Sequence, residues 1–172
     1  MAEKNSETKS ILPSGIPEAT FVEDVDAFMA QPDNSSVETV LSRLEEQHQK
    51  YSFMEMNLKT KKNRLKVQIP DLKSTLAFVE HLIERRGSDK KFETHFQLSE
   101  QVWTKATIKP TEKVNLWLGA NVMLEYSLEE AKALLSNNLT SAKESLEVCD
   151  EELGFIRDQT TTVEVSILLQ KK

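Results

Sequence analysis

The chain of 172 residues has little cysteine, glycine or proline: one, four and five residues respectively. A single cysteine excludes an internal disulfide framework and suits a reducing compartment. Few glycines and prolines, with 29% charged residues, are typical of long helices and coiled coils. No apolar run approaches the ~20 residues of a membrane span, and the polar N-terminus has no signal-peptide core. We therefore expect a cytoplasmic protein that does not bind a membrane.

Motifs of enzymes and of metal sites are also missing. His48, His81 and His95 have no metal-ligand spacing with one another or with Cys149. The chain contains no phosphate loop, nucleophile elbow or dinucleotide fingerprint. A net charge of −6 argues against a nucleic-acid surface. We expect no catalytic residue, no cofactor and no metal, and therefore not an enzyme.

The middle of the chain, about residues 92–126, reads as two consecutive β-hairpins. Apolar and β-branched residues alternate with polar ones over 92–98 and 102–108, which is the period of a strand. Pro110 ends the second strand, and Gly119-Ala120-Asn121 supplies the turn between a second pair of strands. A lone hairpin is marginally stable in water, and open strand edges invite pairing. We infer that the hairpins complete a sheet with other subunits.

A long helix is predicted on each side of the hairpins, about 37–86 and about 128–170. Both segments carry a heptad repeat. The d positions are Val37, Leu44, Tyr51, Leu58, Leu65, Leu72 and Val79 in the first, and Leu128, Leu135, Ala142, Cys149, Ile156 and Val163 in the second. The two helices should therefore pair as one antiparallel coiled coil. The fold class is mainly α, with the two hairpins inserted between the helices.

Local signals set the details of these helices. The a positions His48, Glu55 and Lys62 are polar, which weakens a seam and can fix its register. Pro70 should bend the first helix without changing its phase. Ser127 and Glu130 form a capping box. We expect residues 1–20 to be a disordered tail, with short helical turns over 21–29, and residues 21–172 to form a single domain.

Several large apolar residues lie off the predicted seam, in the half of the coil remote from the hairpins. They are Phe53, Met54, Met56, Phe155, Val165, Leu168 and Leu169. Scattered surface hydrophobes are normal in proteins. Methionines combined with phenylalanines also suit promiscuous binding. Both interpretations remain open on this pattern. A basic run over residues 59–66 is similarly open between solvated flanks of a heptad and a nuclear signal.

The plan of helix, two hairpins and helix resembles that of the α-type prefoldin subunits; the β-type has one hairpin. The resemblance extends to residues over nearly the whole chain beyond residue 14. The matching stretches are GIPEATFVEDVDAFM at 15–29, IPDLKSTL at 69–76, LWLGANVMLEYSLEEAKALL at 116–135 and ELGFIRDQTTTVEV at 152–165.

The resemblance implies a heterohexameric, ATP-independent co-chaperone with two α-type and four β-type prefoldin subunits. Its coiled-coil tips would hold unfolded actin and tubulin and deliver them to the cytosolic chaperonin. The von Hippel–Lindau protein is a further implied partner. The off-seam residues named above are then the expected client-binding set. The expected subunit interface consists of Phe96, Leu98, Val102, Trp103, Leu116, Trp117, Leu118, Val122 and Leu124.

Three other interpretations stay open on the residues alone. A structural coiled-coil tether or adaptor would lack holding activity, although a tether needs no sheet. An enzyme would need a pocket that the sequence does not outline. A nuclear adaptor would use the basic run around Lys61.

Overall fold

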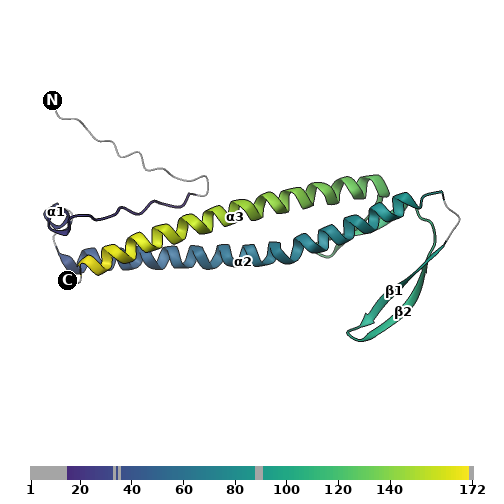
Figure 1. Cartoon of the computed structure of the whole chain (residues 1–172), viewed down its shortest axis with the longest axis horizontal. Helices are drawn as coiled ribbons and strands as arrows, with labels where there is room; N and C mark the ends of the chain where they lie inside the picture. Colours follow the sequence, from purple (N-terminus) through teal and green to yellow (C-terminus); the bar gives the residue numbers. More distant parts are fainter. Residues whose placement is uncertain (1–14, 33, 35, 88–90, 171–172) are drawn as a thin grey trace, which may run out of the picture. The chain divides into compact units, whose positions relative to one another are not determined.

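The computed structural model describes residues 15–32, 34, 36–87 and 91–170. Its elements are α1 (Val25–Met29), α2 (Val37–Glu84), β1 (Phe92–Ser99), β2 (Val102–Ile108), β3 (Lys113–Gly119), β4 (Val122–Ser127) and α3 (Leu128–Gln170) (Figure 1). The predicted fold class, long helices with two inserted hairpins, is confirmed. The chain forms two compact units. The terminal unit contains residues 1–65 and 145–172, and the hairpin unit contains residues 66–144.

In the terminal unit, the first part of α2 lies against the last part of α3 (Figure 1). The d residues Leu44 and Tyr51 of α2 and Ile156 and Val163 of α3 are buried together in one apolar cluster. The heptad repeat predicted this seam. Val37 is an exception, because it is exposed, whereas Val40, three residues later, is buried.

The three polar a positions of α2 each pair with a residue of α3, one heptad apart on both helices. The pairs are His48–Glu164 at 3.0 Å, Glu55–Arg157 at 3.3 Å and Lys62–Asp150. A slip of one heptad in either direction would place the Glu55 carboxylate opposite another carboxylate. Like charges that face each other are unfavourable. This ladder of polar pairs therefore specifies the antiparallel register that the polar positions predicted.

Residues 15–23, here called the strap, lie in an extended conformation along the two helices of the terminal unit (Figure 1). Ile16 is only 5% exposed and belongs to the same apolar cluster as Tyr51 and Ile156. The Tyr51 hydroxyl donates a hydrogen bond to the Pro17 carbonyl at 2.7 Å. The expectation of a disordered tail over 1–20 is therefore wrong for residues 15–20; residues 1–14 lie outside the described residues.

A short turn joins the strap and α1 to α2. The Asp24 side chain caps α1 by accepting a hydrogen bond from the Ala27 N–H at 3.1 Å. Asn34 is buried, donates to the Phe28 carbonyl at 2.8 Å and accepts from Arg43 of α2 at 2.8 Å. The Asn34 side chain therefore hydrogen-bonds both to the Phe28 backbone and to α2. These bonds anchor the strap and α1 where α2 begins.

In the hairpin unit, the end of α2 packs against the start of α3. Val79, Leu82, Leu128, Ala131 and Leu135 form its buried cluster. The bases of both hairpins pack on this cluster through Phe92, Ile108, Val114, Leu116 and Tyr126. Glu80 and Lys132 form an ion pair across the helices at 3.0 Å. The cluster thus holds the hairpins to the helix ends by contacting apolar side chains from all four strands, two of them from β3.

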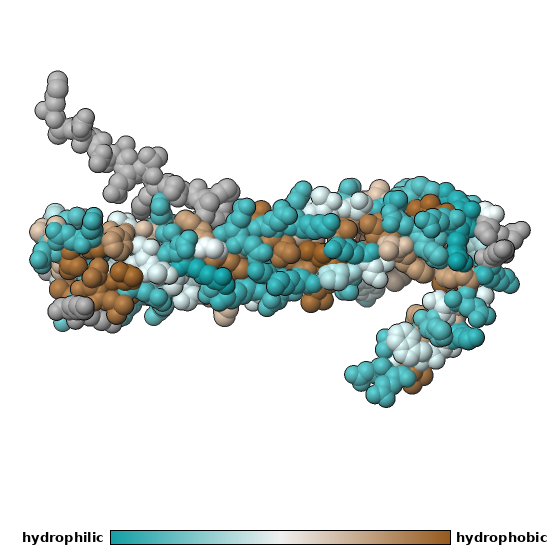
Figure 2. Space-filling model, in the orientation of Figure 1, coloured by the Kyte–Doolittle hydropathy of each residue, from teal (hydrophilic) through white to brown (hydrophobic). Residues whose placement is uncertain are grey.

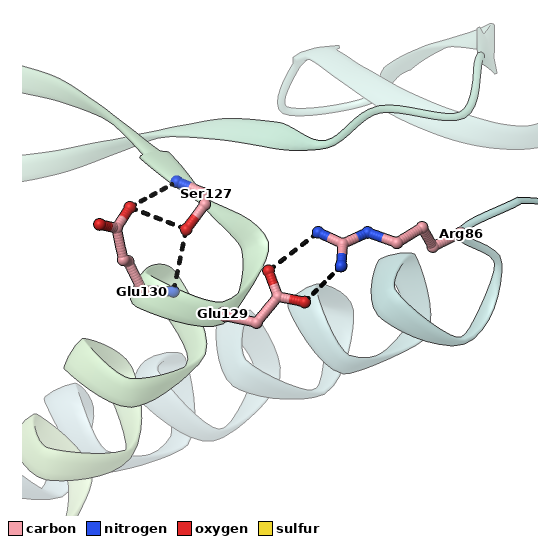
Figure 3. A network of polar contacts seen from close by, with 4 residues as sticks. All are labelled: Arg86, Ser127, Glu129 and Glu130. Carbon is pink, nitrogen blue, oxygen red and sulfur yellow. Dashed lines mark hydrogen bonds and ion pairs between the residues drawn. The ribbon is translucent and has the colours of Figure 1, made fainter.

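Polar contacts define where α2 ends and α3 begins (Figure 3). The Glu130 N–H donates to Ser127 Oγ at 3.3 Å, and the Ser127 N–H donates to Glu130 Oε2 at 3.0 Å. These reciprocal bonds confirm the predicted capping box. Arg86 reaches both carboxylate oxygens of Glu129, one of them at 2.8 Å. Gly87, with φ of +78°, follows α2 in the left-handed conformation that commonly ends a helix.

Each hairpin is a separate antiparallel two-stranded sheet. β1 pairs with β2 from Phe92↔Ile108 to Ser99↔Val102, and β3 pairs with β4 from Lys113↔Ser127 to Gly119↔Val122. Both registers shift by one residue beside the turn. Ala120 and Asn121 have φ values of +48° and +62°, as the two central residues of a tight hairpin turn require.

α2 continues through Pro70. The proline is exposed, while Leu65 and Ile69 before it and Val79 after it are buried on the seam. The phase of the heptad is therefore kept across the proline, as predicted. Because the ring is exposed and takes no part in the buried seam, the cost of Pro70 is confined to the backbone hydrogen bond that it removes.

Candidate interaction surfaces

The first hairpin exposes apolar side chains along most of its length. Residues directly opposite each other in a ladder share a face, so Phe96, opposite Thr104, lies on the face of Phe92 and Ile108. Phe92 and Ile108 are half-buried at the base, whereas Phe96, Leu98 and Val102 are exposed. The apolar face therefore continues beyond the point where the helices cover it.

Trp103 lies on the other face of this hairpin, opposite Gln97, and is 57% exposed. The neighbouring pairs on that face are polar, with Lys105 and Glu93 in an ion pair at 3.5 Å. The predicted interface residues of this hairpin therefore divide between its two faces. An assembly that used all of them would contact the hairpin from both sides.

The second hairpin also has two different faces. Leu116 and Leu124 lie opposite each other, and Leu116 packs on the helices while Leu124 is exposed. On the other face Trp117 is paired with Met123, and their exposed fractions are 60% and 55%. The predicted residues Leu118 and Val122, beside the turn, are exposed too. Sequence reasoning missed Met123, although a strand period of two places it opposite Trp117.

A groove of about 630 Å³ lies in the hairpin unit between β3 and the two helices. Leu72 of α2, Leu116, Trp117 and Leu118 of β3, and Leu134 of α3 contribute apolar walls. Asp71 and Asn138 add polar groups. Predicted interface residues of β3 line this groove, so the second hairpin borders a recessed surface of mixed polarity as well as its exposed apolar one.

The predicted client-binding residues all lie in the terminal unit, and the structure divides them into two groups. Phe53 and Met56 flank Glu55 on α2 and are 60% and 56% exposed. Val165, Leu168 and Leu169 follow Glu164 on α3 and are exposed. The ladder places Glu164 level with His48, so the second group lies toward the start of α2. Figure 2 shows hydrophobic surface gathered at that end of the unit.

Met54 and Phe155 differ from the other five residues of the set. Both are half-buried and pack on the cluster that contains Tyr51 and Ile156. They therefore contribute to the packing of the terminal unit itself, and only part of each side chain is accessible to another molecule.

Burial and hydrogen bonding shift the pKa values of three groups in this unit. Burial raises the pKa of the Tyr51 phenol, so the hydroxyl stays protonated and can donate to the strap. A hydrogen bond from Lys59 lowers the pKa of Glu55, which keeps the carboxylate charged in the ladder. Burial raises the pKa of the Cys149 thiol, which donates to the Leu58 carbonyl at 3.3 Å. A buried, protonated thiol is unreactive, so Cys149 acts as a small seam residue.

The basic run over residues 59–66 is partly engaged in ion pairs. Lys59 contacts Glu55 at 2.8 Å, and Lys62 contacts Asp150 across the seam. Among residues 15–32, 34, 36–87 and 91–170, no cluster of His, Cys, Asp or Glu could hold a metal ion. No helix in that part of the chain is long and apolar enough to cross a membrane.

Comparison with known proteins decides the family. The family model described as prefoldin subunit matches residues 51–168. The chain belongs to the prefoldin subunit family. It is 54% identical to prefoldin subunit 3 of Mus musculus and of Homo sapiens over 153 residues, which are 89% of this chain and 78% of each relative. It is 40% identical to a probable prefoldin subunit 3 of Schizosaccharomyces pombe, covering 93% of this chain and 95% of that protein.

A solved prefoldin structure has the same fold. The filamentous prefoldin of Methanocaldococcus jannaschii, determined by cryo-electron microscopy, is similar over 72% of this chain and 96% of that chain, with a TM-score of 0.51. The sequence identity is 17%, so this similarity supports the fold alone. The chain is a prefoldin-type chaperone subunit, and prefoldin subunits form complexes with other prefoldin subunits.

Proposed function

We propose that this chain is one of two α-type subunits in a prefoldin heterohexamer that also contains four β-type subunits. The complex holds non-native proteins of the actin and tubulin class without ATP and passes them to the cytosolic chaperonin. The 54% identity of this chain to prefoldin subunit 3 supports its place in a prefoldin complex. We also propose that the protein acts in the cytoplasm, with the nucleus as a second location, and that the von Hippel–Lindau protein is a partner.

The exposed apolar surface of the hairpins supports the assembly part of the proposal. Phe96, Leu98 and Val102 of the first hairpin and Trp117 and Met123 of the second are each more than half exposed in the single chain. Two-stranded sheets of this kind are marginally stable alone. Pairing with hairpins of other subunits would bury these side chains and satisfy the open strand edges.

The observation that carries client holding is the exposed apolar set of the terminal unit, Phe53, Met56, Val165, Leu168 and Leu169. A non-native protein can bury its own apolar groups against these side chains, and full burial of one such group is worth ~1.5–3 kcal/mol. Apolar contact requires no particular geometry, so such a surface is promiscuous. Several subunits in one complex would add their weak contacts by multivalency.

Replacing Phe53, Met56 and Leu168 together by serine tests this proposal. These three side chains are more than half exposed, so their replacement should leave the fold and the assembly intact. We expect the variant hexamer to suppress the aggregation of diluted, denatured actin less than the wild-type hexamer does. Light scattering measures the aggregation, and native mass spectrometry verifies the assembly.

Val67→Ser is the matched control. Val67 is 67% exposed but lies in the hairpin unit, on α2. It should therefore suppress aggregation as well as wild type. Equal protection by the triple variant would show that these residues are ordinary surface. It would favour the alternative of a structural tether or adaptor, or holding by the other subunits.

A further inference from the structure

The strap packs on both α2 and α3 of the terminal unit as an extended peptide, and the surface that it covers is here called the strap groove. The buried positions of the strap are Ile16 and Val22, with Ala19 half-buried between them. A spacing of three is the period of a polyproline II segment, whose backbone forms no internal hydrogen bonds. This part of the chain is therefore held by the helices and not by secondary structure of its own.

The groove binds the strap through its backbone. Tyr51 donates from its hydroxyl to the Pro17 carbonyl at 2.7 Å, and the Gln159 side chain accepts from the Ala19 N–H at 2.6 Å. Tyr51 is 1% exposed and Gln159 is 9% exposed, so both polar groups are recessed in the groove. A carbonyl and an N–H two residues later occur in almost any polypeptide. The two side chains thus bind backbone atoms, whatever the sequence of the bound segment. This pair of hydrogen bonds is here called the backbone grip.

Ile16 of the strap lies in an apolar cluster with residues from both helices, and this cluster is here called the apolar floor: Val40, Leu44, Tyr51, Ile156 and Val163. Another extended chain could bind in the same way if a large apolar residue directly preceded the residue whose carbonyl accepts the hydrogen bond from Tyr51. Unfolded polypeptides expose such segments along their whole length.

We propose that the strap groove is a binding site for an extended apolar segment of a non-native client, and that the strap is its built-in competitor. This inference rests on the proposed holding function and names the form of the client that this site takes. The strap covers the apolar floor while no client is present, which prevents the floor from associating with other chains. A client segment binds when it displaces Ile16, Pro17 and Ala19.

Competition by the strap has a predictable size. A tethered segment acts at an effective concentration of ~1 mM. If the free peptide and the strap bind the groove equally, with Kd near ~0.1 mM, the tether weakens the apparent affinity for the peptide about tenfold. Releasing the strap should therefore raise the apparent affinity for the peptide about tenfold.

The test uses the complex assembled with its partner subunits and a fluorescent peptide of residues 15–23, with binding followed by anisotropy. Ile16→Asp places a charge against the apolar floor and should release the strap. We expect this variant to bind the peptide about tenfold more tightly than wild type. Phe21→Asp makes the same chemical change at a strap residue that is 55% exposed, and should bind as wild type does.

A milder variant keeps the test decisive if Ile16→Asp does not assemble. Ile16→Ala removes most of the apolar side chain without adding charge, and should give an affinity between those of wild type and the aspartate variant. An affinity for the peptide that is unchanged by both substitutions at Ile16 would overturn the proposal.

The backbone grip is tested with modified peptides. Methylating the amide nitrogen of Ala19 removes the donor to Gln159, and we expect about five- to tenfold weaker binding to the Ile16→Asp complex. Methylating the amide of Thr20, the next residue, should have no such effect. Equal weakening by the two methyl groups would overturn the backbone grip.

The same complexes in the actin aggregation assay separate the two proposals. If the wild-type complex does not suppress aggregation, the proposed function is overturned. If it does, while the strap-released complex still fails to bind the peptide, the groove alone is overturned. Tighter peptide binding together with stronger suppression by Ile16→Asp supports both.

Discussion

Single polar residues in the seam determine how the two helices of the terminal unit align. Apolar d residues favour pairing but accept a shift of seven residues, since one apolar layer resembles the next. The polar residues His48, Glu55 and Lys62 do not accept such a shift, because it would place the Glu55 carboxylate opposite the carboxylate of Glu164 or of Asp150. Exposed ion pairs contribute little stability, about 0–1 kcal/mol each. Their role here is therefore in register.

A charge exchange at the central pair tests this role. Glu55→Lys places a cation beside Arg157 and Lys59 and should lower the free energy of unfolding by about 1 kcal/mol. Adding Arg157→Glu should recover part of the loss. Urea unfolding of the full chain, followed by circular dichroism, gives the coupling from the two single variants and the double variant.

Glu46→Lys provides the matched control for this exchange. Glu46 pairs with Lys50 on the same helix and should show no coupling to Arg157→Glu. An equal coupling at both positions would show that the recovery reflects total charge and not the ladder.

At the scale of the element, α2 keeps a continuous seam although it contains a proline. Pro70 removes the N–H that would bond the Lys66 carbonyl, yet its exposed ring leaves the packing of Leu65 and Ile69 undisturbed. The heptad period therefore predicted the element correctly across a residue that usually breaks helices.

Pro70→Ala should restore this hydrogen bond and raise the free energy of unfolding by up to ~3 kcal/mol, the cost of proline inside a helix. Urea unfolding of the full chain is the measurement. Pro110→Ala is the control, because Pro110 lies after β2 and outside the helices. It should be neutral or destabilising by ~0.4–1 kcal/mol. A stability unchanged by Pro70→Ala would mean that the backbone around residue 66 stays open without the ring.

At the scale of the whole molecule, the hairpins expose more apolar surface than a single chain usually does. Trp117 and Met123 form an exposed apolar pair on one face of the second hairpin, and Leu118 and Val122 extend the exposed apolar surface beside its turn. Large exposed apolar surfaces are typical of interaction sites. Under the proposed function, we expect the hairpins of other subunits to cover this surface.

Trp117→Asp should therefore prevent assembly, because an unpaired charge buried in a shared sheet is costly. Native mass spectrometry should detect the variant as a free, aggregation-prone subunit. Asn115→Asp places the same charge on the same face one pair away from the turn, where the Asn115 side chain is already polar and exposed. The control should assemble. An intact hexamer that contains Trp117→Asp would contradict the assignment of this face to the interface.

Local patterns in the sequence determined the helices, the hairpins, the Ser127 cap and the seam residues, since each depends on neighbours within a few residues. Only the tertiary structure decided which residues outside the seam are buried. Val40 lies in the cluster that also contains Ile16, and Leu82 lies in the cluster that holds the hairpins, although no repeat distinguishes them from exposed neighbours. Ile16, Tyr51 and Gln159 form one site from segments about 35 and 140 residues apart. The periodicity of a sequence indicates which face of a helix is apolar. Which segment covers that face depends on contacts between residues that are far apart in the sequence.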